Sequence, residues 1–97
     1  MHRIDIGKGM TDRIIEGTIN ILKNKNDGVP FRDIKDQFAD PLIRYYEDNF
    51  NYERDREATY IQIFNTLCHY CSEENAEIKI KEKGRSYNSY IFCSTQQ

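Results

Sequence analysis

The sequence contains no tryptophan, only two prolines, and no apolar run long enough to cross a bilayer. A membrane span needs about 20 consecutive apolar residues, so we expect neither a spanning helix nor a membrane partner. The first ten residues lack the apolar core of a secretory signal, and three cysteines are an odd number for a disulfide framework. These absences favour an intracellular protein with reduced thiols, cytoplasmic or, in a eukaryote, nuclear.

An excess of positive charge is also absent, because 14 basic and 16 acidic residues give a formal net charge of -2. Any contact with nucleic acid must therefore come from a local basic cluster. The 97 residues, 38% hydrophobic and 31% charged, have the composition of one folded domain. Gly7 to Gly9 is too short for a phosphate-binding loop, and two histidines without a matched nucleophile give no catalytic triad. We expect a protein that is not an enzyme and has no cofactor.

The chain is organised around a predicted long helix over residues 51–72. At helical spacing its apolar residues form one wide side, predicted to face the core: Tyr60, Ile61, Ile63, Phe64, Leu67, Cys68 and Cys71. The other side is polar and nearly uncharged in its middle: Asp55, Ala58, Thr59, Gln62, Asn65, Thr66, His69 and Glu73. Gln, Asn, Thr and His side chains make hydrogen bonds to partners, so this side is a candidate contact face.

Three shorter helices are predicted before the long one. The first starts after Thr11 as N-cap and ends before Gly28, and Gly17 in its interior indicates close approach by another helix. The second covers residues 31–38, and the third starts at Pro41 and runs to about residue 48. Residues 1–10 are predicted to be a flexible arm, and residues 11–95 the folded domain.

A hairpin is predicted after the long helix. Residues 76–82 alternate isoleucine with charged residues, which is typical of a half-buried strand. Residues 83–88 have turn chemistry, and residues 89–93 form a return strand. The predicted fold class is α+β, with three to four helices followed by a C-terminal two-stranded β-hairpin.

This order resembles a winged helix-turn-helix domain, in which the hairpin is the wing and the helix before it recognises DNA. The stretch DGVPFRDI, from Asp27 to Ile34, is similar to the link into helix two of HARE-type winged helices. These include the N-terminal domain of the bacterial RNA polymerase delta subunit. The resemblance implies a small DNA-binding transcription regulator or accessory factor, with double-stranded DNA or a transcription-machinery protein as partner.

The predicted wing carries the densest basic cluster of the chain: Lys79, Lys81, Lys83 and Arg85. Lysine and arginine along a wing tip bind phosphate, although lysines also protect the exposed edge of a sheet from pairing. On the long helix, the candidates for reading base edges are Gln62, Asn65, Thr66 and His69. Asp55 and Glu73 bracket them and repel phosphate, so a protein-contact face or plain solvent exposure stays open.

Aromatic residues crowd the connection before the long helix: Tyr45, Tyr46, Phe50 and Tyr52. They either pack beneath the loop or form a protein interface, where tyrosine is enriched. We expect an interface, with a homodimer as one form of it. A winged-helix module that binds protein and not DNA is therefore the alternative function.

Cys68 and Cys71 form a C-x-x-C motif, which raises the questions of zinc and of redox chemistry. A helix C-terminus disfavours thiolate, so a redox pair is not expected there. Zinc needs four ligands; Cys93 is a third candidate, but His69 falls on the opposite side of the helix. We expect small buried thiols and no metal site.

Overall fold

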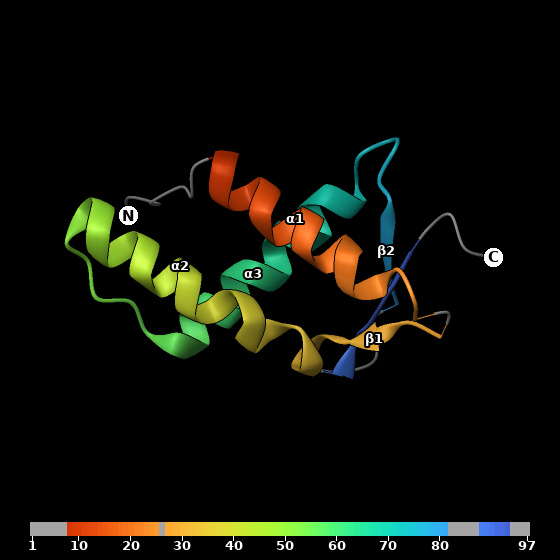
Figure 1. Ribbon diagram of the computed structural model, residues 1–97, viewed down its shortest axis with the longest axis horizontal. Coiled ribbons are helices and arrows are strands. Elements are labelled where there is room, and N and C mark those ends of the chain that lie inside the picture. The colour runs from red at the N-terminus through yellow and green to blue at the C-terminus, as the bar shows by residue number, and fades with distance from the viewer. Residues whose placement is uncertain (1–7, 26, 82–87, 94–97) are drawn as a thin grey trace.

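The computed structural model of the protein describes residues 8–25, 27–81 and 88–93. Figure 1 shows the chain from the N-terminus to the C-terminus. Its elements are α1 (Lys8–Leu22), β1 (Val29–Pro30), the 3-10 helix η1 (Phe31–Asp33), α2 (Lys35–Phe50), α3 (Arg56–Cys71), β2 (Ile78–Lys81) and β3 (Tyr90–Cys93). The predicted α+β class is confirmed. None of the helices in the described part of the chain is long and apolar enough to span a membrane.

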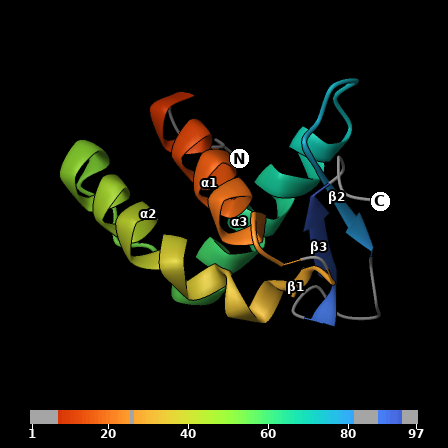
Figure 2. The same ribbon diagram turned by 45° about the vertical axis from the view of Figure 1, so that its right-hand side comes forward.

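The three strands form one antiparallel sheet in the order β1-β3-β2, so the last strand in sequence lies in the middle. β1 pairs with β3 through Val29 opposite Ile91, and β2 pairs with β3 through Ile80 opposite Ile91. The predicted two-stranded hairpin is therefore present as β2 and β3, and the extended link at Val29–Pro30 adds a third strand that was not predicted. The order of elements is compatible with a winged helix. Figure 2 shows the three helices on one side of this sheet.

Helix α1 begins at Lys8, earlier than the predicted N-cap at Thr11. Residues 8–10 of the predicted arm are thus helical, and residues 1–7 lie outside the described residues. The close approach expected at Gly17 is confirmed, since the ring of Phe38 from α2 lies where a Cβ on Gly17 would be, 2.6 Å from its nearest carbon. Thr18 is fully buried in the same helix and donates its hydroxyl to the carbonyl of Ile14 at 2.8 Å.

Helix α2 replaces the two short helices predicted before residue 50. It runs without interruption through Pro41, so the predicted start at that proline was wrong. A mid-helix proline removes one backbone hydrogen bond and costs about 3 kcal/mol. Here the buried residues of α2 lie on both sides of Pro41, and burying one large apolar side chain yields about 1.5–3 kcal/mol. They are Phe38, Ala39, Leu42 and Tyr46. Burial along the stripe outweighs the lost bond.

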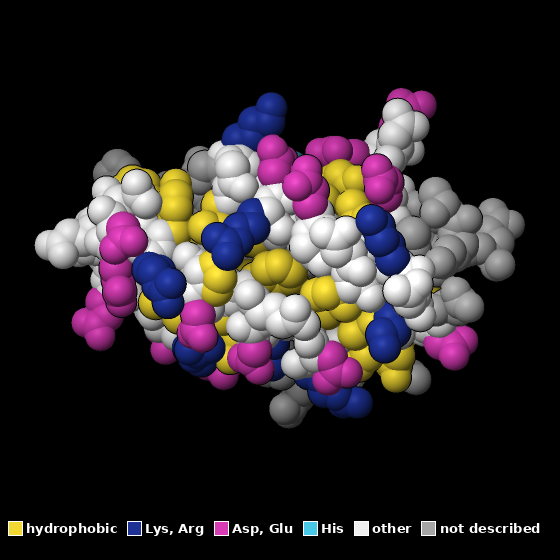
Figure 3. All heavy atoms as spheres, viewed as in Figure 1, with side chains coloured by type: hydrophobic (Ala, Val, Ile, Leu, Met, Phe, Trp, Pro, Cys, Tyr) yellow, Lys and Arg dark blue, Asp and Glu magenta, His cyan; other side chains and the backbone are white. Residues whose placement is uncertain are grey.

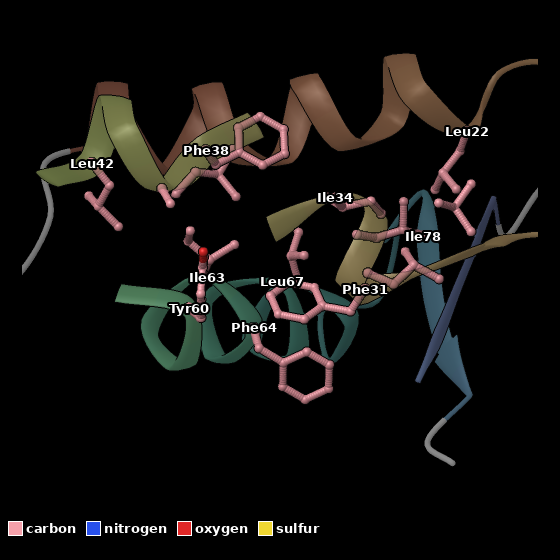
Figure 4. Close-up of a cluster of buried hydrophobic side chains, with 14 of the residues drawn as sticks. Leu22, Phe31, Ile34, Phe38, Leu42, Tyr60, Ile63, Phe64, Leu67 and Ile78 are labelled. Atoms are coloured by element: carbon pink, nitrogen blue, oxygen red, sulfur yellow. The ribbon is translucent and has the colours of Figure 1, made fainter. Parts of the chain in front are cut away.

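The core lies between the helices and the inner face of the sheet. Figure 4 shows Phe38 and Leu42 of α2 above the apolar side chains of α3, with Phe31 and Ile78 toward the strands. Phe31 and Phe64 meet edge to face, with ring centroids 5.0 Å apart. On the outer surface drawn in Figure 3, acidic and basic side chains are interspersed with hydrophobic ones. That face therefore carries no broad patch of one charge.

Candidate nucleic-acid interface

Helix α3 starts at Arg56, because Asp55 caps it; the predicted residues 51–54 form a link instead. The Asp55 carboxylate accepts a hydrogen bond from the backbone N–H of Ala58 at 3.1 Å, which satisfies an otherwise unpaired donor of the first turn. The buried side of α3 consists of Thr59, Tyr60, Ile63, Phe64 and Leu67. This side packs on α1, α2 and β2 and fixes which residues face outward.

Two residues of α3 lie on the opposite side to the one predicted. Thr59 was expected on the polar face but is fully buried, and its hydroxyl donates to the carbonyl of Asp55 at 2.8 Å. Ile61 was expected in the core but is 58% exposed. A threonine that bonds its own helix buries no unpaired polar group, and the core side is accordingly shifted around the helix toward Thr59. Ile61 is left on the outside.

The exposed side of α3 is a stripe formed by Ile61, Asn65 and His69, one turn apart from each other; we call it the α3 stripe. Asn65 and His69 are two of the four predicted base-reading residues, and within the described part of the chain their side chains make no hydrogen bond. Glu57 begins the same row one turn earlier and is exposed. The α3 stripe thus contains no lysine, arginine or carboxylate, and an acidic residue precedes it.

The other two predicted base-reading residues are engaged inside the molecule. Gln62 is half-buried and donates its Nε2 to the hydroxyl of Tyr46 at 2.7 Å, while its buried Oε1 accepts no hydrogen bond from any residue that the structure describes. Thr66 is half-buried and donates to the carbonyl of Gln62 at 2.8 Å. Gln62 would have to leave Tyr46 to reach a base. The polarity of Gln62 and Thr66 did not predict exposure to solvent, because their hydrogen-bond partners are Tyr46 of α2 and the backbone of α3.

The arginines at the start of α3 also have partners. Arg54 lies over the ring of Tyr46, 4.8 Å from its centroid. Arg56 forms an ion pair with Asp40, and its guanidinium lies 3.8 Å from a carboxylate oxygen of Asp36. The hydroxyl of Tyr60 donates to Asp36 as well. These contacts join α2 to α3 and leave little unbalanced positive charge there.

The wing candidates divide into two pairs. Lys79 and Lys81 are exposed on β2, as the alternation predicted, and they lie opposite Phe92 and Tyr90 of β3. Their side chains occupy the outer face of the sheet, because Ile78 and Ile91 fill the inner face next to the helices (Figure 2). Lys83 and Arg85 lie outside the described residues.

The aromatic residues around the α2–α3 connection form one cluster. Tyr46 is fully buried, so its prediction as an interface residue was wrong; it is the centre of the cluster. Its ring lies 6.0 Å from that of Phe50 and 6.1 Å from that of Tyr52, centroid to centroid. Phe50 is 47% exposed, Tyr52 is 45% exposed and Tyr45 is half-buried. The left-handed Asn51, with φ of 48°, turns the chain between the two exposed rings.

Cys68 and Cys71 are half-buried near the end of α3. Burial raises the pKa of the Cys71 thiol to about 11, and the nearby Cys68 contributes to the shift. A thiol with this pKa is almost entirely protonated at neutral pH, the opposite of an activated cysteine. Among the described residues no three His, Cys, Asp or Glu side chains gather as a metal site would require. The side chain of Cys93 lies outside the described residues.

Tyr90 and Phe92 are partly exposed residues that were not among the predicted site residues. The alternation of side chains along the return strand could have predicted their exposure, since Ile91 between them is buried.

Comparison with protein families, with curated proteins and with solved structures gave no match.

Proposed function

We propose that this protein is a winged-helix protein that binds double-stranded DNA and is not an enzyme. The order of helices and strands, with β3 between β1 and β2, supports the winged-helix part of the proposal. In this arrangement α3 corresponds to the helix that enters the major groove. The loop between β2 and β3 corresponds to the wing.

The α3 stripe is the observation that carries the proposal. Asparagine pairs with adenine through two hydrogen bonds, and an apolar side chain such as that of Ile61 suits the methyl group of thymine. Asn65 lies at the centre of the stripe and is exposed on a helix whose other side is held in the core. An exposed amide on a rigid helix is well placed to read a base, because its position is fixed before binding.

Phosphate contacts in this proposal come from the wing, through Lys79 and Lys81 and through Lys83 and Arg85. Acidic residues near α3 oppose them: Glu57 precedes the α3 stripe, and Glu73 and Glu74 follow the helix. With a net charge of -2, non-specific attraction to DNA is weak, so base contacts must supply much of the affinity. We expect binding that is measurable at low salt and lost steeply as salt rises.

The test is a fluorescence-anisotropy titration with duplexes selected from a random pool at about 50 mM salt. Asn65→Ala should weaken binding to the preferred duplex by about 1–3 kcal/mol and relax the preference at one base pair. Lys79→Ala and Lys81→Ala should each flatten the slope of log affinity against log salt by about 0.9. The control is Asn20→Ala, an exposed asparagine on α1. Absence of binding in this salt would overturn the proposal.

A protein-interaction module is the second candidate, and the exposed rings of Phe50 and Tyr52 favour it. Two large, partly exposed aromatic side chains around one turn resemble an interface anchor more than a solvent-facing loop. If this cluster joins two copies, sedimentation will show a dimer in the wild type that Tyr52→Ala dissociates, while Asn65→Ala leaves it intact. A wild type that remains monomeric at every accessible concentration contradicts the homodimer.

A further inference from the structure

The outer face of the sheet carries two aromatic rings and two lysines in matched pairs. Lys81 lies opposite Tyr90, and Lys79 lies opposite Phe92, in the register of β2 and β3. Side chains of directly opposite residues point to the same face of a sheet. Lys79, Lys81, Tyr90 and Phe92 therefore form one surface, which we call the sheet platform. The three helices lie on the other face (Figure 2).

The two rings of the sheet platform are close and nearly parallel. The centroids of Tyr90 and Phe92 are 6.2 Å apart, and their planes differ by 28°. Both side chains are partly exposed. Phe92 is held against the backbone of Gly28, where a Cβ would come within 2.6 Å of the ring. Gly28 also has a φ of +81°, which other residues rarely adopt. The position of the Phe92 ring therefore depends on this glycine.

Two shallow hollows are lined by lysine and aromatic side chains together. One, of about 320 Å³, is lined by Lys79, Ile80, Lys81 and Phe92. A second, of about 200 Å³, is lined by Asp27, Lys81, Tyr90 and Phe92. The Lys79 ammonium lies 6.0 Å from the centroid of Phe92. Each hollow thus has an aromatic wall and a cationic wall, and the Asp27 carboxylate stands at the rim of one.

We infer that the sheet platform binds single-stranded nucleic acid. Unpaired bases stack on aromatic side chains regardless of their sequence, while neighbouring lysines hold the phosphates. The platform offers both groups in alternation, with two rings on one strand and two ammonium groups on the next. A duplex keeps its bases inside and would use the lysines alone. An acidic peptide would likewise have no use for two adjacent rings. The two lysines and the two rings of the sheet platform together therefore favour a ligand that carries both negative charges and unpaired planar bases.

This inference does not rest on the proposed base contact, because Tyr90 and Phe92 come from β3 and the α3 stripe comes from α3. Lys79 and Lys81 are common to both proposals, whereas Tyr90 and Phe92 belong to the platform alone. Variants of the rings and variants of Asn65 therefore separate the two. A protein that fails to bind duplex DNA can still bind a single strand, and the reverse also holds.

The experiment measures anisotropy of a labelled oligothymidylate of about 12 nucleotides, a length in the range of single-strand sites. Tyr90→Leu should weaken binding about 5- to 150-fold, the effect of losing one stacked base. Lys79→Gln and Lys81→Gln should each reduce the salt slope by about 0.7. Lys8→Gln, an exposed lysine on α1, and Asn65→Ala should leave binding unchanged.

A second readout keeps an aromatic ring at position 90. The chain has no tryptophan, so Tyr90→Trp places a single reporter on the platform, and stacking of thymine should quench its fluorescence. Polyglutamate at equal charge should neither quench it nor displace the oligonucleotide. The inference is overturned if Tyr90→Leu with a wild-type circular dichroism spectrum binds as well as the wild type. It is overturned equally if the oligonucleotide leaves the indole fluorescence of the Tyr90→Trp variant unchanged, or if polyglutamate competes as effectively as the single strand.

Discussion

At the scale of single residues, Gly17 is a position where the absence of a Cβ atom allows two helices to pack closely. The ring of Phe38 occupies the space that a Cβ would need, at 2.6 Å, and Phe38 is itself only 7% exposed. Gly17→Ala gains about 1 kcal/mol of helix propensity, but the buried ring must move. We expect a net loss of about 1–3 kcal/mol in the free energy of unfolding, measured by urea denaturation.

Gly9 in the same helix is the matched control for this substitution. A Cβ on Gly9 meets nothing within 4 Å. Gly9→Ala should therefore stabilise the protein by about 0.4–1 kcal/mol, through the unfolded chain alone. Equal effects of the two substitutions would show that the Gly17–Phe38 contact is unimportant.

The thiol of Cys71 allows a prediction of pH dependence. With its pKa raised to about 11 by burial, about one thiol in a thousand is ionised at pH 8. Maleimide labelling of Cys71, followed by peptide mass spectrometry, should be about 100-fold slower in the folded protein than in urea at that pH. The rate should rise about tenfold per pH unit as the pH approaches the pKa. Fast labelling of the folded protein at pH 7 would indicate an activated cysteine.

Single residues also explain which site predictions succeeded. The alternation of residues 78–81 was sufficient to place Lys79 and Lys81 outside, because a strand allows two sides only. Side chains point in all directions around a helix, so residues at the border between the buried and exposed sides are harder to assign. Ile61 and Thr59 were therefore assigned to the wrong sides. Gln62 and Tyr46 were taken as contact residues, but they bond to each other across α2 and α3. The residue pattern of one helix cannot show which side chain of another helix will form a hydrogen bond with it.

At the scale of elements, hydrophobic periodicity located the helical regions but not the residues at which the helices begin and end. α2 was divided at Pro41 because the local signal of a proline is strong, whereas the stripe of buried residues that continues past it has a tertiary cause. β1 was taken as a link, because two residues have no detectable period. Its backbone hydrogen bonds come from β3, far along the chain.

A polar cluster between α2 and α3 predicts acid sensitivity. The hydrogen bond from Tyr60 lowers the pKa of Asp36 from its ordinary value of 3.8, burial opposes this, and Lys35 and Arg56 lower the pKa further. The folded carboxyl thus titrates below the unfolded one. Its ionised form stabilises the fold above about pH 4, and this contribution is lost as the pH falls through the folded pKa.

Melting temperatures between pH 7 and pH 2 test this cluster. Asp36→Asn and Tyr60→Phe should each lower the melting temperature at pH 7 and converge on the wild type in acid. Because the Asp36 side chain is 63% exposed, the effect should not exceed about 1 kcal/mol. A difference that stays constant over the whole pH range would mean that another interaction causes it.

At the scale of the whole molecule, Phe31 joins the sheet to the helices. It is fully buried, its ring meets Phe64 of α3, and its backbone N–H donates to the carbonyl of Ser89 at 2.9 Å. Phe31→Ala should cost about 3–5 kcal/mol, a large part of the total stability of a small domain. Thermal unfolding followed by circular dichroism measures this. Phe50→Ala, at a 47% exposed ring, is the control and should change stability by about 1 kcal/mol or less.

The position of β3 in the middle of the sheet has a consequence for synthesis on the ribosome. α1, α2 and α3 can emerge and pack while β1 and β2 have no strand between them. Until Tyr90 to Cys93 are translated, the edges of β1 and β2 and the N–H of Phe31 await their partners. The pairing of β1 with β3 is distant in sequence, so it is slow to form, whereas β2 and β3 form a local hairpin. A chain released before Tyr90 is added would therefore be a helical species with two unpaired strand edges, the kind of species that chaperones bind.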